Sequence, residues 1–559
     1  MWGLVAIALL FLILFFYWPV ARLLAEGLTH NEKFSLDFIV QILTDAYFQH
    51  VIGFTFYQAL WSTLASIALG LPLAYILTHY DFPGKRWLRA FTIVPFVLPS
   101  ITVALGFALL LGRRGYLNQL LMGLLGLNEP PLALMYSLEG IILAHAFYNA
   151  PIIVRTVHAA WEKLDPRYEE SARVLGAGRL AVFKDITLPM IFPSLLSGAA
   201  LVFIFCFLSF PIVLTIGGGR FSTIEVEIYT RVITLLDPQL LNYKLGAALA
   251  LLGLVISLGM TYLYLRLQGS LTYSTELLRP RPTEPLFAKE SLWRPSRWLI
   301  GGYLFLCALI FLGPMLAVLF DSFWEETATG GGWTLRWYSY IFAPDYDALL
   351  GDAPLRAVLN SLWVGLTAAL LALVLGLIFA YGIARARWRG RRALDTLLMA
   401  PLATSSVILA FAFLRAFSTP PLMLVGSTLV VVLVHAMIVF PFVVRVLVPL
   451  MEGFDQRLSE AARTLGASAF RALREIELPL LAPGVLAGVV FAFALSLGEM
   501  SATLMLAPPG FATMPISVYR LVSQQTWGAP SAMSVLMIFS SFLAFWLLER
   551  AGERTLKGF

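Results

Sequence analysis

Charged residues are scarce in this chain of 559 residues. Asp, Glu, Lys and Arg make up 13% of it, whereas soluble domains carry roughly 25%. Hydrophobic residues make up 59%. A single globule of this length and composition would be too apolar to stay in water, so the composition excludes a soluble domain and predicts a membrane protein.

Cysteine and histidine are also rare. Cys206 and Cys307 both lie in apolar runs, which predicts buried thiols and no disulfide framework. The six histidines show no metal-ligand spacing, and the sequence has no phosphate-binding Walker loop or catalytic triad. We therefore expect no covalent chemistry and no bound metal or cofactor on this chain. The formal charge of +6 is better explained by basic cytoplasmic loops than by nucleic-acid binding.

Long apolar runs are what the sequence has in abundance. About 20 residues cross a bilayer, and twelve runs approach or exceed that length, near 2–25, 52–79, 88–112, 138–160, 190–216, 244–267, 297–320, 357–384, 394–416, 424–450, 480–507 and 531–549. The first run could be a cleaved signal peptide, but it lacks a basic start and is too long, so we expect a retained helix. The predicted fold is an all-α polytopic membrane protein of about twelve helices.

A short polar segment between apolar runs occurs twice, at a constant offset of 290 residues. Its marked positions are Glu170, Ala172, Gly176 and Pro189 in the first copy and Glu460, Ala461, Ala462, Gly466 and Pro479 in the second. The constant offset also implies that the two halves of the chain are parallel repeats of six helices each.

Each polar segment has the features of a short helix outside the membrane. Asp165 and Asp455 are placed to cap its first turn, and Gly176 and Gly466 suit a left-handed stop at its end. One such segment could be an amphipathic connector that rests on the lipid headgroups. Two copies with identical internal spacing favour a helix that docks into the groove of a partner.

The pattern Glu-Ala-Ala, three residues, Gly, nine residues, Ile-x-Leu-Pro resembles the EAA loop of permease subunits of bacterial ATP-binding-cassette importers. The second copy matches throughout, and the first departs at Ser171. The resemblance implies a type I importer fold in which each loop is a coupling helix that docks on an ATP-hydrolysing subunit. It also implies two copies of that subunit, with ATP and Mg²⁺ bound there, and an extracytoplasmic solute-binding protein.

The domain boundaries and the orientation follow from the repeat and the basic loops. We expect a first permease repeat over 1–268, with its coupling loop at about 161–189, a cytoplasmic linker over 269–296, and a second repeat over 297–559, with its loop at about 451–479. Lys and Arg gather in loops that fall on one face, which predicts cytoplasmic coupling loops and termini in a bacterial inner membrane. Sixteen extra residues around Tyr116 to Pro131 lie on the other face and are expected to contact a delivering protein.

Glu499 is the clearest ionisable residue inside a predicted span. Such a group costs about 2.5–3.5 kcal/mol on insertion scales, so it indicates a substrate path, here for a cation. Alternatively, its carboxylate reaches water at the outer end of the span. Ser209, which aligns with Glu499, together with Ser496 and Ser501, would add hydrogen bonds to substrate or permit close helix packing. His145 and His435 are expected to satisfy helix contacts.

Within the family, the fused form resembles the thiamine and iron(III) permease group. The stretches 145–151, 216–219 and 223–225 are most similar to thiamine permeases, and 499–504 is also similar to iron(III) permeases. We expect thiamine as substrate, with iron(III) as the alternative and polyamines or phosphonates further away. A secondary transporter of twelve helices is the alternative of another class, but it would need ion-coupling charge pairs within its spans.

Overall fold

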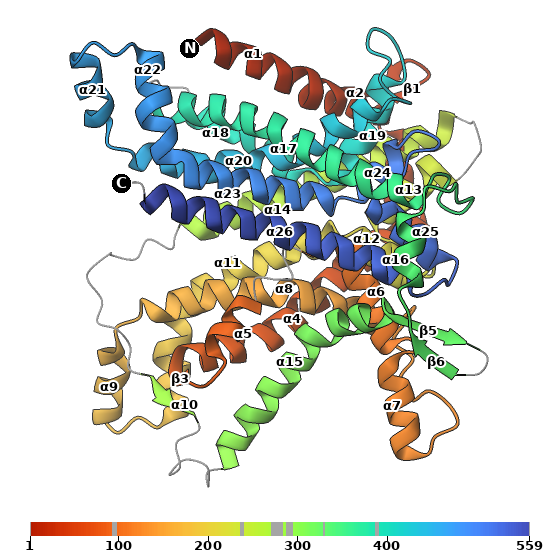
Figure 1. Ribbon diagram of the computed structural model, residues 1–559, viewed down its shortest axis with the longest axis vertical. Helices are drawn as coiled ribbons and strands as arrows, with labels where there is room; N and C mark the ends of the chain where they lie inside the picture. The colour runs from red at the N-terminus through yellow and green to blue at the C-terminus, as the bar shows by residue number, and fades with distance from the viewer. Residues whose placement is uncertain are drawn as a thin grey trace.

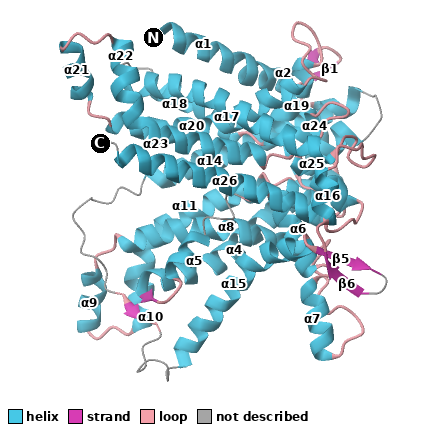
Figure 2. Ribbon diagram, viewed as in Figure 1, coloured by secondary structure: helices cyan, strands magenta, loops and turns pink. Residues whose placement is uncertain are grey.

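The computed structural model describes residues 2–91, 98–234, 240–269, 283–286, 295–327, 330–385 and 391–557. The predicted linker, 269–296, lies mostly outside these residues. Helices make up most of the described part, where the strands form three short pairs (Figure 2). The pairs are β1 (Thr29–His30) with β2 (Lys33–Phe34), β3 (Tyr80–Asp81) with β4 (Glu284–Pro285), and β5 (Trp324–Thr327) with β6 (Gly330–Trp333).

The helices follow the same order in both halves. The first half contains α1 (Trp2–Leu12), η1 (Ile13–Tyr17), α2 (Trp18–Gly27), α3 (Asp37–Thr44), α4 (Ala46–His79), α5 (Lys85–Phe91), α6 (Ser100–Leu111), α7 (Tyr116–Leu125), α8 (Leu138–Glu162), α9 (Pro166–Val174), α10 (Arg179–Val182), η3 (Phe183–Thr187), α11 (Leu188–Phe207), α12 (Pro211–Gly217), α13 (Ile224–Tyr229), η4 (Thr230–Thr234) and α14 (Leu240–Gly269). The second half contains α15 (Pro295–Asp321), α16 (Arg336–Phe342), α17 (Pro354–Arg385), α18 (Arg391–Met399), η6 (Ala400–Ala403), α19 (Ser406–Phe417), α20 (Thr428–Gly453), α21 (Gln456–Thr464), α22 (Ala469–Ala472), η7 (Leu473–Glu477), α23 (Leu478–Leu497), α24 (Ser501–Leu506), α25 (Met514–Ser523) and α26 (Ala529–Lys557).

Ten helices in the described residues are long and apolar enough to cross a membrane. The segments Leu394–Ala403 and Ser406–Phe417 pass the same test only together, and they are bent by 99° at the break between them, as in a broken span or a re-entrant loop. The predicted run 88–112 corresponds to α5 and α6, and residues 92–97 between them lie outside the described part. These helices confirm the predicted all-α polytopic fold.

The two ends of the molecule differ in what they carry. In Figure 1, α9 and α21 lie at the left end, on the side where both chain termini are marked. The right end carries α7, α13, α16, α25 and the β5–β6 hairpin. Both copies of the polar segment therefore face the same side, as parallel repeats require.

Each half holds the first helix of the other half. Helix α2 belongs to the first half and packs on α19 of the second half. Helix α15 belongs to the second half and packs on α6 of the first half. The Tyr17 hydroxyl donates a hydrogen bond to the Leu397 carbonyl at 2.8 Å, and the Arg415 guanidinium pairs with Glu26 at 2.7 Å. This exchange joins the two repeats into one body, although the connection between them runs outside the described residues.

Close helix contacts inside each half depend on a glycine at the same repeat position. A Cβ atom at Gly70 in α4 would lie 2.8 Å from Cβ of Ile153 and 2.9 Å from the Ala150 carbonyl in α8. A Cβ atom at Gly376 in α17 would lie 2.7 Å from Val443 in α20. Because lipid is as apolar as the side chains, such close backbone approach is a main source of helix association in a membrane.

We expect Gly70→Leu to destabilise the protein by about 1–3 kcal/mol, because the new side chain overpacks the contact between α4 and α8. Gly259→Leu in α14 is the matched control, since an added Cβ there meets nothing within 4 Å. The melting temperature of each purified variant in detergent measures the difference. Equal melting temperatures for the two variants would contradict this account of the packing.

Candidate functional site

The two polar segments fold as the sequence predicts at their N-terminal ends. A carboxylate oxygen of Asp165 accepts a hydrogen bond from the backbone N–H of Arg167 at 3.0 Å. Asp455 makes the same bond to Arg457, also at 3.0 Å. Each aspartate thus satisfies one of the backbone donors that the first turn of a helix leaves free, which fixes where α9 and α21 begin.

The C-terminal ends are also alike. Gly176 has a φ angle of +91° and Gly466 one of +93°, the left-handed conformation expected from sequence. In each copy the backbone N–H that follows the glycine reaches back to an alanine carbonyl, from Ala177 to Ala172 and from Ala467 to Ala462, both at 3.0 Å. This glycine-terminated arrangement stops the helix and turns the chain back toward the spans.

Apolar side chains point away from the protein at both helix ends. Leu175 is 87% exposed and Leu465 is 88% exposed, and Val174 is equally open. The carboxylates of Glu170 and Glu460 are exposed beside them, as is Ala461. Large apolar side chains presented in pairs at one end of a molecule are typical of a surface that a partner covers.

A hydrogen bond between a carboxylate and a hydroxyl anchors each segment to the following span. In the first copy the Thr187 hydroxyl donates to Glu169 at 2.8 Å, and in the second the Ser459 hydroxyl donates to Glu477 at 2.7 Å. All four side chains are buried. The positions correspond at the offset of 290 (459 − 169 and 477 − 187), so the acid and the hydroxyl have exchanged places between the halves.

The sequence analysis missed this anchor, although the repeat contains its signal. At one position of the repeat an acid in the first half is replaced by a hydroxyl in the second, and at the other position the replacement is reversed. Such a paired exchange indicates that the two side chains are in contact. The anchoring residues Thr187 and Glu477 end the π-helical turns η3 and η7, and π-helical turns are frequent at functional sites. Pro189 and Pro479 then occupy the first turns of α11 and α23.

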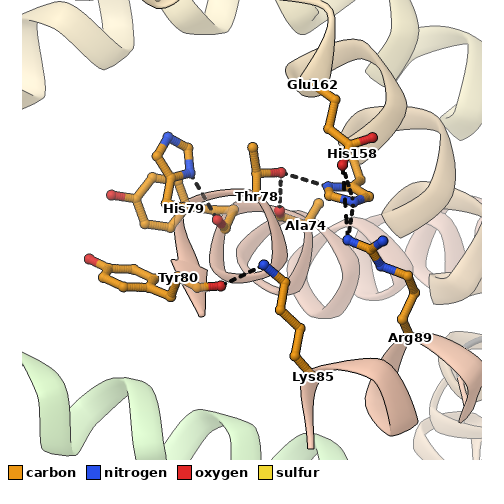
Figure 3. A network of polar contacts seen from close by, with 9 residues as sticks. Ala74, Thr78, His79, Tyr80, Lys85, Arg89, His158 and Glu162 are labelled. Carbon is orange, nitrogen blue, oxygen red and sulfur yellow. Dashed lines mark hydrogen bonds and ion pairs between the residues drawn. The ribbon is translucent and has the colours of Figure 1, made fainter. Parts of the chain in front are cut away.

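A network of polar contacts lies at the end of α8, just before the first polar segment (Figure 3). One ring nitrogen of His158 lies 2.7 Å from the Thr78 hydroxyl, and the other lies 3.2 Å from Glu162 and 3.1 Å from Arg89. Nearby, the Lys85 ammonium donates to the Tyr80 carbonyl at 2.7 Å, and partial burial lowers the pKa of this lysine. In the second half, Arg391 pairs with Glu452, which aligns with Glu162.

The fifth span of each half is broken near the end that lies opposite α9 and α21. In place of the predicted continuous runs 190–216 and 480–507, α11 ends at Phe207 before α12 begins at Pro211, and α23 ends at Leu497 before α24 begins at Ser501. Pro211 has no N–H to continue a helical ladder. In the second half the break falls at Gly498, where an added Cβ would lie 3.3 Å from Cα of Pro99 in the first half. The break in the second half therefore lies where the two halves meet.

Two of the predicted path serines are engaged by the histidines. His145 lies between the hydroxyls of Ser62 at 3.0 Å and Ser209 at 2.8 Å. His435 lies between Ser496 and Thr503, both at 2.7 Å. These hydrogen bonds confirm that each histidine satisfies contacts between helices. Within the described residues there is no grouping of three or more potential metal ligands.

Glu499 has a different neighbour from the one its alignment with Ser209 suggests. Its half-buried carboxylate accepts hydrogen bonds from the Ser406 hydroxyl at 3.1 Å and from the Ala502 N–H at 3.0 Å. Ser406 begins α19, directly after the bend in that span, and Ser501 is buried at the start of α24. The structure thus brings Glu499 beside the bend and leaves Ser209 and Ser496 bound to histidines.

The chain matches the family of binding-protein-dependent transport system inner membrane components twice, over residues 66–272 and 372–557. It belongs to this family. Because both matches lie in one polypeptide, the chain is a fused permease subunit of an ATP-binding-cassette importer. Its family and its apolar spans make it a multi-pass protein of the bacterial inner membrane.

Curated relatives align along nearly the whole permease. The thiamine transport system permease protein ThiP of Escherichia coli (strain K12) is 27% identical over 527 residues, covering 93% of this chain and 92% of that protein. ThiP of Brucella suis biovar 1 is 31% identical over 507 residues, covering 88% and 86%. The putative ferric transport system permease protein FbpB 1 of Haemophilus influenzae is 26% identical, covering 91% and 78%.

The acid and the hydroxyl of the anchor have exchanged places between the halves. We therefore expect the first half of the permease to tolerate the order found in the second half, with the hydroxyl first and the acid second. Thr187→Glu alone should destabilise the protein by about 1–3 kcal/mol, because it places a second carboxylate against that of Glu169. Combining it with Glu169→Ser restores one acid and one hydroxyl and should recover most of the loss. The melting temperature in detergent measures both variants. A double variant no more stable than Thr187→Glu alone would mean that the two positions do not act as a pair.

Proposed function

We propose that this permease imports a cationic solute, thiamine, with energy from two ATP-binding subunits that dock on α9 and α21. The observation that carries the proposal is the pair of similarly capped polar segments at one end of the molecule, each with an exposed leucine and an exposed glutamate. A short helix with an open apolar face suits a groove on a partner. This end would face the cytoplasm, together with both termini, since ATP is there.

ATP and Mg²⁺ would bind in the partner subunits. The permease would convert the motion of those subunits into transport. When those subunits close, they would carry α9 and α21 with them. The buried hydrogen bonds Glu169–Thr187 and Ser459–Glu477 join these helices to the starts of α11 and α23. Both helices are followed by a break, and the break after α23 lies where the halves meet, so their movement would open the path on one side and close it on the other. Glu170, Ala172, Gly176, Glu460, Ala461, Ala462 and Gly466 would form or shape the docking surfaces, with Pro189 and Pro479 starting the helices that they move.

The opposite end would receive the extracytoplasmic solute-binding protein. The predicted extra residues of the first half form α7 and the loop after it, which project from that end (Figure 1). Leu124 is 73% exposed there, and Leu120 and Leu125 are also open. An apolar surface present on one half alone would orient a delivering protein relative to the two halves.

Thiamine is the substrate that we favour. The chain spans 92% and 86% of the length of the two relatives named for thiamine transport but 78% of the one named for ferric transport, and the carboxylate of Glu499 would stabilise a cation. Iron(III) is the second candidate, because a permease named for ferric transport is 26% identical and carboxylate oxygens also bind hard metal ions. Glu499, Ser209, Ser496 and Ser501 remain the predicted path residues, with Glu499 as the charged one.

Leu175→Asp and Leu465→Asp should each weaken binding of an ATP-binding subunit, and the double variant should abolish co-purification of the complex. A buried aspartate at an apolar contact costs several kcal/mol when unpaired. Leu124→Asp changes another exposed leucine, at the opposite end of the molecule; it is the control and should leave co-purification intact. Retention of both ATP-binding subunits by the double variant would contradict docking on α9 and α21.

The substrate can be identified on the extracytoplasmic protein that stimulates ATP hydrolysis by the reconstituted importer. We expect mass spectrometry of the ligand released from that protein to find thiamine or a thiamine phosphate. Metal analysis of the same sample tests the second candidate. Bound iron without thiamine would replace the thiamine assignment and leave the importer assignment unchanged.

A further inference from the structure

The bend before α19 brings together two carboxylates from different halves of the chain. Ser405 and Ser406 are consecutive residues at this bend. The Ser405 hydroxyl donates a hydrogen bond to Glu225 at 2.6 Å, and the Ser406 hydroxyl donates to Glu499 at 3.1 Å. Glu225 lies in α13 of the first half, whereas Glu499 lies in the break of the fifth span of the second half.

Glu225 is buried without a countercharge. It is 1% exposed, and its second carboxylate oxygen has no hydrogen-bond partner among the described residues. Glu227, two residues further on in the same helix, is also buried, but it pairs with Arg231 at 2.6 Å and accepts a hydrogen bond from the Tyr47 hydroxyl at 2.7 Å. Within the described part of the chain, no basic side chain forms an ion pair with Glu225 or Glu499.

A buried carboxyl group of this kind has two ways to avoid the cost of an isolated charge. It can hold a proton, or a cation can lie against it. A structural carboxyl that only needs a proton would be expected to satisfy both oxygens, as most buried polar groups do. The free oxygen of Glu225, the nearby carboxylate of Glu499 and the two serine hydroxyls leave acceptors for a positively charged guest.

The position of this cluster fits the entry side of a path between the halves. In the fold, α13 and α24 both pack on α19, and all three lie at the end opposite α9 and α21 (Figure 1). The break that holds Glu499 also contacts Pro99 of the first half through Gly498. Motion of α23 relative to α19 would therefore change the distance between the two carboxylates.

We infer that Glu225, Ser405, Ser406 and Glu499 form a cation station between the two halves, which takes an organic monovalent cation as it enters the path. The inference rests on the proposed function and adds Glu225 and the two bend serines to the path. Two carboxylates and two hydroxyls supply charge and hydrogen-bond acceptors, and they suit an organic cation better than a metal ion that requires a full shell of ligands.

The station is tested through a cysteine at the bend, so that the readout does not depend on the identity of the substrate. Ser405→Cys is introduced with Cys206 and Cys307 replaced by alanine, and the complete importer in liposomes turns over ATP during labelling. Two thiosulfonate reagents of similar size are compared, one cationic with an ethylammonium group and one anionic with an ethylsulfonate group. We expect the cationic reagent to react about tenfold faster once both rates are normalised to free thiol, because the carboxylates concentrate cations.

Glu225→Gln should remove most of that preference, because the amide keeps the size of the side chain but loses its charge, whereas Glu225→Asp should retain part of it. Glu26→Gln is the matched control, since Glu26 is an acid between the halves that already pairs with Arg415. The control should label as the parent does. Equal rates for the two reagents in the parent, no labelling by either, or an unchanged preference in Glu225→Gln would each overturn the station.

Thiamine uptake by the same liposomes separates this inference from the proposed substrate. With the native bend serine, Glu225→Gln should raise the KM for thiamine about tenfold. Charge-selective labelling without any thiamine uptake by the parent would support the station and refute thiamine as substrate. Thiamine uptake that is identical in Glu225→Gln and the parent, together with unselective labelling, would keep the substrate and remove Glu225 from the path.

Discussion

A polar group within a membrane must find its partner inside the protein, since the hydrocarbon core supplies no hydrogen bonds. The broken spans of this permease depend on that constraint. His145 joins α4 to the end of α11 through Ser62 and Ser209, and His435 joins α20 to α23 and α24. The two histidines occupy the same repeat position but use hydroxyls from different positions. The constraint therefore requires that each ring nitrogen have a hydrogen-bond partner, but it does not fix which residue provides the hydroxyl.

The hydrogen bonds that anchor the two polar segments also use different residues in the two halves, but here both partners differ together. A hydrogen bond between Glu169 and Thr187 needs one donor and one acceptor, and it works equally well when the acid stands on the other side, as Ser459 and Glu477 show. Both versions are buried, so the loss of either partner would remove a buried hydrogen bond. This explains why an otherwise close repeat differs at both positions together. These hydrogen bonds join α9 and α21 to the turns that precede α11 and α23.

Local features of the fold were predictable from sequence, and features that depend on distant contacts were not. The caps at Asp165 and Asp455 and the left-handed glycines depend on a few neighbouring residues, and the repeat at 290 residues displayed each of them twice. Apolar runs marked the spans but not their breaks, because hydropathy stays high through α11 and α12. The exchange of the first helices and the contact of Glu225 with Ser405, 180 residues apart, arise only when the halves pack together.

Fusion of two unlike repeats limits the number of carboxylates that lie between the halves. Glu499 aligns with Ser209, and Glu225 aligns with Pro515 (515 − 225 = 290), so each half contributes one carboxylate and the two come from different elements. Two identical permease subunits would place both carboxylates twice, with four negative charges around the same interface. Like charges in a region of low dielectric repel strongly. A single chain with unlike halves avoids that repulsion, because the position that aligns with Glu499 is Ser209, which forms a hydrogen bond with His145.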